Sequence, residues 1–354
     1  EVLVTDSPTL EDEPKLAGLC RDMRELAEMP RADLGKKLRA LPDAYRDWID
    51  RQRARVRSAA SRIEGFEADA EKAMQQCEAT LARIRDGLAL LAGNDSAAEA
   101  FRFANRAMWK QRVHTVFSEA VRQGSDQPLE AFDRPDNRTW RTFQLAFLLL
   151  NLDSVTNLHH PHRSDPTKAV ADLLWFPTGG GKTEAYLGLA AYTMGLRRLQ
   201  GEVAGRSGEC GVAVLMRYTL RLLTLQQFQR ATALICACEL IRREAEAAGK
   251  PVWGKEPFRI GLWVGSKSTP NWTEDAAEAL KQTKDVKARQ ASNIGGKGSP
   301  VQLKSCPWCG STIEPGRHVR VDPFASGSGR TLTYCGATAA ARLQSGSLRT
   351  KACR

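Results

Sequence analysis

A run of glycines followed by lysine and threonine lies in the stretch LLWFPTGGGKTEAYLG, residues 173–188, between an apolar run and a helical pattern. Glycine frees the backbone dihedral angles, so successive N–H groups can turn toward phosphate oxygens. The N-terminus of the following helix also favours anions. Lys182 can then reach the β- and γ-phosphates, and the Thr183 hydroxyl can hold Mg²⁺. The stretch therefore predicts a site for ATP and Mg²⁺.

The predicted loop departs from the strict phosphate-loop pattern at its first position, where Phe176 replaces glycine. The form without the leading glycine resembles that of superfamily 2 helicases, and it disfavours a small-molecule kinase. The structural alternative is a chance glycine turn. We expect Lys182 and Thr183 to be the catalytic residues. The predicted ATP contacts of the loop are Pro177, Thr178, Gly179, Gly180, Gly181, Lys182 and Thr183.

Two flanking segments extend this hypothesis. The segment RTFQ resembles the adenine-recognising segment of these helicases, with Gln144 on the base edge and Phe143 stacked on the base. Downstream, Arg217, Thr219 and Arg221 lie in a segment that resembles the one with which helicases hold single-stranded DNA. The alternative for Gln144 is a solvent-exposed glutamine on an amphipathic helix. The alternative for Arg217 and Arg221 is that they only keep the start of a helix in contact with solvent.

A second chemical signal is the pair Cys306 and Cys309 in SCPWCGS. Two thiols at this spacing can hold one zinc ion, and Cys335 in TYCG is the expected third ligand. Either Cys353 or His318 could be the fourth ligand. The alternative is a pair of core cysteines. The remaining cysteines fit small core residues, namely Cys20, Cys77, Cys210, Cys236 and Cys238.

Composition narrows the class of protein. A chain of 354 residues with 42% hydrophobic and 26% charged residues is typical of a soluble globular protein. The longest apolar run, residues 145–152, is too short to span a bilayer, and no signal sequence opens the chain. Together these features predict a cytoplasmic protein without membrane contact.

The net charge of +11 is concentrated near the end of the chain. Residues 281–354 hold 13 lysines and arginines against three acidic residues, whereas the preceding 280 residues are almost balanced. A basic surface for DNA is one interpretation, and a solvated basic loop is the alternative.

Periodicity predicts the elements that position these residues. Apolar residues repeat at helical spacing over residues 14–93 and 97–124, and a turn-rich connection follows at 124–140. Beyond it, runs suited to strands at 171–176, 211–217 and 258–265 alternate with helices. This order predicts an α/β fold with a P-loop, RecA-like parallel sheet, an all-helical N-terminal domain before it, and an inserted zinc-ribbon segment.

The expected domains follow from these shifts in pattern. They are a helical domain at 1–123, an incomplete first RecA-like domain at 124–280, a basic zinc-ribbon insertion at 281–336, and an atypical tail at 337–354. The tail has an Ala/Arg/Ser bias typical of a frame-shifted translation.

Several stretches together resemble the DrmA helicases of DISARM anti-phage systems, over residues 41–336. They include AFRFANRAMWKQR, WRTFQLAFLLLNL, the phosphate-loop stretch, VLMRYTLRLLTLQQFQRA and CPWCGSTIEPG. The resemblance implies the N-terminal part of a superfamily 2 ATPase that loads on DNA, with a single-stranded portion. It also implies a partner subunit in bacterial defence.

The chain departs from a complete helicase in two ways. No Asp-Glu pair follows to hold Mg²⁺ and orient the attacking water, and no arginines of a second motor domain follow. We therefore expect negligible ATP hydrolysis by the isolated chain. The alternative from another functional class is a non-catalytic, zinc-containing DNA-binding fragment.

Overall fold

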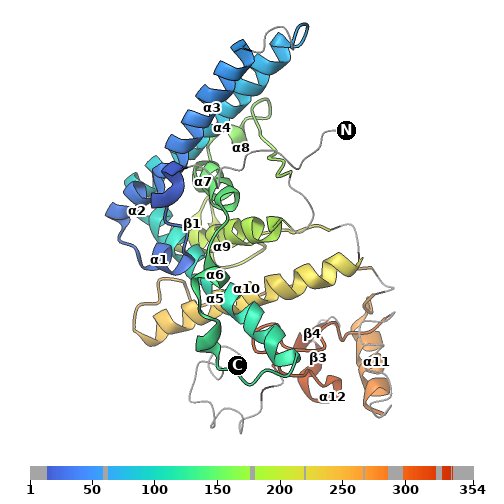
Figure 1. The fold of residues 1–354 in the computed structure, drawn as a ribbon. Coiled ribbons are helices and arrows are strands. Elements are labelled where there is room, and N and C mark those ends of the chain that lie inside the picture. Colours follow the sequence, from blue (N-terminus) through green and yellow to red (C-terminus); the bar gives the residue numbers. More distant parts are fainter. Residues whose placement is uncertain are drawn as a thin grey trace. The chain divides into compact units, whose positions relative to one another are not determined.

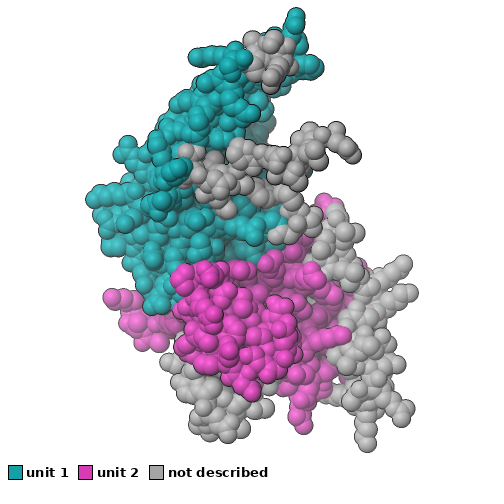
Figure 2. Space-filling view, in the orientation of Figure 1, with its two compact units in different colours: residues 1–109, 138–215 teal, residues 110–137, 216–354 magenta. Residues whose placement is uncertain are grey.

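The computed structural model describes residues 14–58, 63–175, 180–218, 221–265, 268–285, 298–323, 329–335 and 337. Its internal contacts divide the chain into two compact units, coloured separately in Figure 2. The first unit comprises residues 1–109 and 138–215, and the second comprises residues 110–137 and 216–354. The domain boundaries predicted from the sequence stay predictions, because compact units need not be independently folding domains.

Helices build the first unit. Their bounds, with α5 continuing into the second unit, are η3 Pro14–Gly18, α1 Met23–Glu28, α2 Arg31–Leu38, α3 Ala40–Ser58, α4 Glu67–Gly93, α5 Asp95–Arg122, α7 Thr142–Thr156, α8 Pro161–Ser164 and α9 Lys182–Gln200. The short strands β1 (Glu202–Val203) and β2 (Arg206–Ser207) form an antiparallel pair after α9. Figure 1 shows α3 and α4 side by side as a long pair of helices.

The core of the first unit forms where α7 packs against α4 and α9. Buried leucines Leu145, Leu148 and Leu152 lie along α7, so this helix is enclosed by its neighbours. The backbones approach closely at Gly87 of α4, where an added Cβ would lie 2.0 Å from the Leu149 carbonyl oxygen. Burial of apolar surface, at about 25 cal/mol per Å², is what stabilises such a layer of helices.

The second unit combines helices with a small hairpin. Its elements are η5 Leu129–Phe132, α6 Pro135–Arg138 at the junction of the units, α10 Arg221–Ala247, α11 Thr273–Asp285, α12 Pro315–His318, β3 Val319–Pro323 and β4 Gly329–Thr333. The strands β3 and β4 pair antiparallel, with Val319 opposite Thr333. A small core holds Leu280, Val301, Leu303, Ile313 and Val319, with Phe228 of α10 and Val321 packed against it.

The helical part of the sequence prediction is confirmed. The sequence predicted helices in the stretches that α3, α4, α5, α7, α9 and α10 occupy. In α3 and α4, apolar residues at intervals of three and four place one stripe of the helix toward a neighbour, and this pattern is local in sequence. Among the described residues, no helix combines the length and apolarity needed to cross a bilayer.

The predicted parallel sheet is wrong. In the part of the chain that the structure describes, the named strands are β1–β4, in two antiparallel pairs. The runs at 171–175, 211–217 and 258–265 form no strand, and Phe176 lies outside the described residues. Leu173, Leu215 and Trp263 in these runs are 87%, 85% and 98% exposed. A parallel strand needs hydrogen-bonded neighbours and helices over both faces, and an apolar run does not supply these partners by itself.

Candidate functional site

The N-terminus of α9 carries the residues predicted to hold phosphate. Gly181 is the N-cap, and its φ of 84° lies in the left-handed region that glycine adopts readily. Lys182 and Thr183 form the first turn of α9, and both are half-buried. Pro177, Thr178 and Gly179 lie outside the described residues, as does Phe176. The described half of the loop thus has the turn-to-helix geometry that phosphate binding requires.

The start of α7 holds this loop through its backbone carbonyls. Gln144 donates from Nε2 to the carbonyl oxygen of Gly181 at 2.7 Å, and Arg141 donates from Nη1 to that of Gly180 at 2.9 Å. The Gln144 Oε1 atom accepts from the backbone N–H of Arg141 at 2.8 Å, which caps the N-terminus of α7. A segment 37 residues upstream therefore fixes the orientation of the loop.

The structure places Gln144 against the glycine loop, and its predicted contact with adenine stays a prediction. Its side chain is buried, with 3% of its surface exposed, and its amide bonds to backbone groups of the loop and of α7. Phe143 is half-buried at the same helix start. These hydrogen bonds hold the start of α7 beside the glycine loop.

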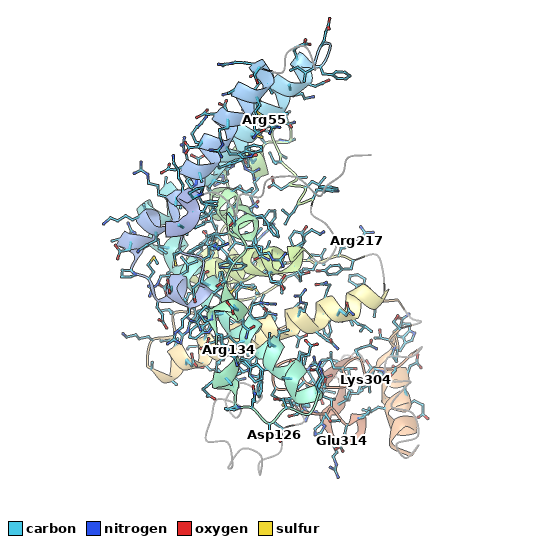
Figure 3. All side chains as sticks on the ribbon, viewed as in Figure 1. Arg55, Asp126, Arg134, Arg217, Lys304 and Glu314 are labelled. Atoms are coloured by element: carbon cyan, nitrogen blue, oxygen red, sulfur yellow. The ribbon has the colours of Figure 1, made fainter. Side chains whose placement is uncertain are left out.

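The predicted DNA-contacting residues are the first residue of α10 and two residues that precede this helix in the sequence. Arg217 is exposed and is labelled in Figure 3. Thr219 lies outside the described residues, and Arg221 is the first residue of α10 with a side chain that is also outside them. DNA contact by these three residues stays a prediction.

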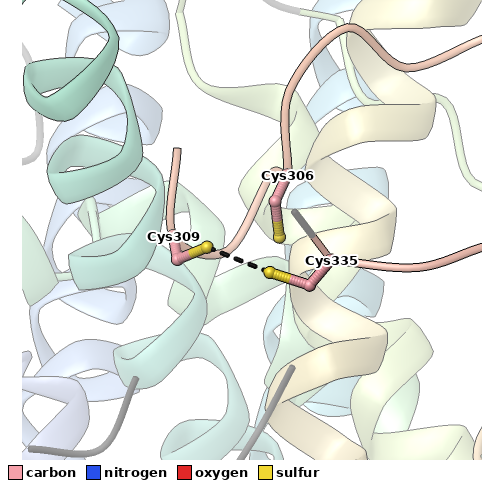
Figure 4. A group of neighbouring side chains, drawn as sticks. All are labelled: Cys306, Cys309 and Cys335. Atoms are coloured by element: carbon pink, nitrogen blue, oxygen red, sulfur yellow. Dashed lines mark hydrogen bonds between the residues drawn. The ribbon is translucent and has the colours of Figure 1, made fainter. Parts of the chain in front are cut away.

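The three predicted zinc cysteines lie together (Figure 4). The sulfur atoms of Cys306, Cys309 and Cys335 are all within 4.8 Å of one another, and those of Cys309 and Cys335 are 3.3 Å apart. Zn–S bonds of about 2.3 Å place two sulfurs of a tetrahedral site about 3.8 Å apart. The spacing therefore fits three ligands of one ion, and soft thiolate donors favour zinc among the common divalent metals.

Backbone geometry positions the first two thiols. The N–H of Gly310 donates to the carbonyl oxygen of Cys306 at 2.9 Å, and the N–H of Cys306 donates to that of Ser311 at 2.8 Å. Gly310 has a φ of 76°, and a Cβ there would lie 2.7 Å from the Ser118 carbonyl oxygen of α5. Only glycine permits both the turn and this close approach to α5.

His114 of α5 packs against the residue between the two cysteines. Its ring stacks on Trp308 with centroids 3.4 Å apart, and its Nδ1 bonds to the Trp308 carbonyl oxygen at 2.9 Å. Burial lowers the pKa of His114 to about 3, so the neutral ring donates this bond from Nδ1–H. His114 was not predicted as a site residue, because its only signal in the sequence is a lone histidine in a helical repeat.

Of the two proposed fourth ligands, the structure describes only His318, which does not join the cluster. Nδ1 of His318 accepts a hydrogen bond from the N–H of Glu314 at 2.8 Å, and His318 lies outside the three-thiol group. Cys353 lies outside the described residues.

Comparison with protein-family models gave no match. A search of characterised proteins found a relative in Bacillus paralicheniformis, named DISARM protein DrmA. The identity is 37% over 318 residues, which cover 88% of this chain and 26% of the relative. The chain thus spans about a quarter of the length of that protein. The resemblance to DrmA seen in the sequence is confirmed.

Proposed function

Because this chain is related to part of a DISARM protein DrmA, we propose that it is the nucleotide- and DNA-binding portion of an ATP-dependent DNA translocase of anti-phage defence. The observation that carries the proposal is the glycine turn at the N-terminus of α9, with Lys182 and Thr183 in the first turn. Foreign DNA is met inside the cell, so the proposed place of action is the cytoplasm, together with a partner subunit.

In this proposal ATP phosphates lie against the start of α9. Lys182 neutralises charge on the β- and γ-phosphates, and the Thr183 hydroxyl is the residue that would hold Mg²⁺. The hydrogen bonds of Gln144 and Arg141 to the loop carbonyls keep the turn in place, so less ordering is needed when nucleotide binds. Gln144 and Phe143 are the proposed adenine contacts, and Pro177 to Gly181 the proposed phosphate cradle.

The nucleotide site is tested with Lys182→Ala. A charge-assisted hydrogen bond contributes about 1.5–3 kcal/mol, so we expect the Kd for a fluorescent ATP analogue with Mg²⁺ to rise roughly 10- to 100-fold. Fluorescence anisotropy measures it. Lys250→Ala is the matched control, because Lys250 is exposed after α10, far along the chain from the loop. Equal affinity in wild type and Lys182→Ala would contradict the nucleotide site.

The DNA-binding part of the proposal rests on charge. Residues 281–354 carry 13 lysines and arginines against three acidic residues, and Arg217 is exposed. If about five such side chains contact phosphates, log affinity falls against log salt with a slope of about −4 to −5.

Titration of a duplex with a single-stranded tail at several salt concentrations measures this slope. Arg217→Gln should make the slope shallower by about 0.7 to 0.9 if Arg217 contacts one phosphate. Arg55→Gln is the control, since Arg55 is an exposed arginine of α3 (Figure 3). A slope near zero in the wild type would count against DNA binding.

We also propose that Cys306, Cys309 and Cys335 hold a structural zinc ion, on the strength of their spacing. Zinc would link the segment after α11 to the end of the β3–β4 hairpin. Removal of the ion by chelation should therefore destabilise both segments. This site also suits the second candidate function, a non-catalytic zinc-containing DNA-binding module. DNA binding together with no response of nucleotide affinity to Lys182→Ala would favour that module.

A further inference from the structure

An ion pair connects α4 to the segment of chain that precedes the glycine loop. Arg83 of α4 donates from Nη1 to Oδ1 of Asp172 at 2.6 Å and from Nη2 to Oδ2 at 2.7 Å. Asp172 directly precedes the stretch 173–188, which contains the loop. Two parallel hydrogen bonds between a guanidinium and a carboxylate fix their relative orientation as well as their distance.

Protein atoms cover most of this ion pair. The side chain of Arg83 is 15% exposed and that of Asp172 is 25% exposed. Water and salt screen an ion pair on the open surface, whereas a covered pair with two hydrogen bonds keeps more of its attraction. Residues 171–175 form no helix or strand, so this segment depends on side-chain contacts such as those of Asp172 for its position.

The contacts on the two sides of the loop belong to one layer of helices. The start of α7 holds the carbonyl groups of Gly180 and Gly181. Arg83 lies one helical turn before Gly87, the residue at which α4 approaches the backbone of α7. Because α4 and α7 pack together, the helix layer rather than the loop sets the distance between these contacts.

We propose that Arg83 and Asp172 are positioning residues of the nucleotide site, because their ion pair holds the segment before the glycine loop against α4 while α7 holds the end of the loop. The assignment deepens the nucleotide site of the proposed function and depends on it. A loop that is held on both sides loses less conformational freedom when ATP phosphates bind. The pair therefore strengthens nucleotide binding through the loop, without contact to the nucleotide.

The test is a double-mutant cycle in the whole chain, with the Kd of the fluorescent ATP analogue and Mg²⁺ as the measured quantity. Arg83→Gln and Asp172→Asn each break the ion pair, and each should raise the Kd roughly 3- to 10-fold. The double variant should raise it no further than a single variant does, because the two residues act as one unit. Urea unfolding confirms that each variant is folded under the conditions of the titration.

Arg46→Gln is the matched control. Arg46 of α3 forms an ion pair with Glu78 of α4 at 3.1 Å, so its loss also removes a contact of α4 but none of the segment before the loop. The Kd of this variant should equal that of the wild type. An equal rise in Arg46→Gln and Arg83→Gln would mean that loosening of α4 is responsible, and would overturn the role of the Arg83–Asp172 pair.

The possible outcomes separate the two proposals. An unchanged Kd in Lys182→Ala overturns the nucleotide site, and the positioning role with it. A raised Kd in Lys182→Ala together with unchanged values in Arg83→Gln and Asp172→Asn overturns the positioning role alone, as do effects that add in the double variant. Asp172→Asn keeps the size of the side chain in a segment without regular secondary structure, so it gives a result even if Arg83→Gln does not fold.

Discussion

At the scale of single residues, His114 couples the packing of the cysteine segment to pH. The folded protein holds its ring neutral against Trp308, and burial lowers the pKa of His114 to about 3. An unfolded histidine has a pKa of about 6.5. Between these values the unfolded chain binds a proton that the folded chain does not. The free energy of unfolding therefore falls as pH falls below about 6.5, by about 1.4 kcal/mol per pH unit from this group.

We predict that His114→Gln removes this pH dependence. Glutamine can donate a hydrogen bond to the Trp308 carbonyl oxygen but does not titrate, so the variant should be less stable at pH 7.5 through lost stacking. Between pH 7.5 and 5.5 the wild type should lose about 1.4 kcal/mol more than the variant does. Urea unfolding at both pH values measures the difference. Titration of the cysteines acts on both proteins and cancels, and equal losses in the two would contradict the prediction.

At the scale of elements, helices α4 and α7 depend on one glycine for their close approach. Gly87 of α4 faces the backbone of α7, where an added Cβ would lie 2.0 Å from the Leu149 carbonyl oxygen. Backbone cannot yield as a flexible side chain can, so the two helices must separate to admit a methyl group. The same layer includes α9, whose N-terminus carries Lys182.

We predict that Gly87→Ala destabilises the protein by about 1–3 kcal/mol, as overpacking of a core does. Gly35→Ala in α2 is the control, since nothing lies within 4 Å of a Cβ there and alanine should stabilise the helix by about 0.5–1 kcal/mol. The two substitutions should thus shift Tm in opposite directions in thermal unfolding. A rise in Tm with Gly87→Ala would show that the helices do not approach as described.

At the scale of the whole molecule, the runs that fail to form strands leave apolar side chains in solvent. Leu173, Leu215 and Trp263 are the most exposed of them. Isolated exposed apolar residues are ordinary, but large ones on unpaired backbone favour association between chains.

We predict that the isolated chain self-associates and binds a hydrophobic dye through these runs. The triple variant Leu173→Gln, Leu215→Gln, Trp263→Gln should scatter less light at equal concentration and bind less dye, because it removes the largest exposed apolar groups. Val252→Gln is the control, at a residue that is 51% exposed in a turn after α10. If the triple variant associates as the wild type does, another surface is responsible.

The amino-acid sequence by itself determined the helices, the glycine turn before Lys182 and the grouping of three cysteines. Helical periodicity, the glycine turn before Lys182 and the spacing of Cys306 and Cys309 are local patterns that need no distant partner. Only the tertiary structure determined which distant parts of the chain these segments contact. Among the described residues the apolar runs found no strand partners, Gln144 met the Gly181 carbonyl 37 residues away, and His114 stacked on Trp308 between the two cysteines. Sheet pairing and ligand sets depend on contacts between segments far apart in the chain, and a pattern within one segment does not specify them.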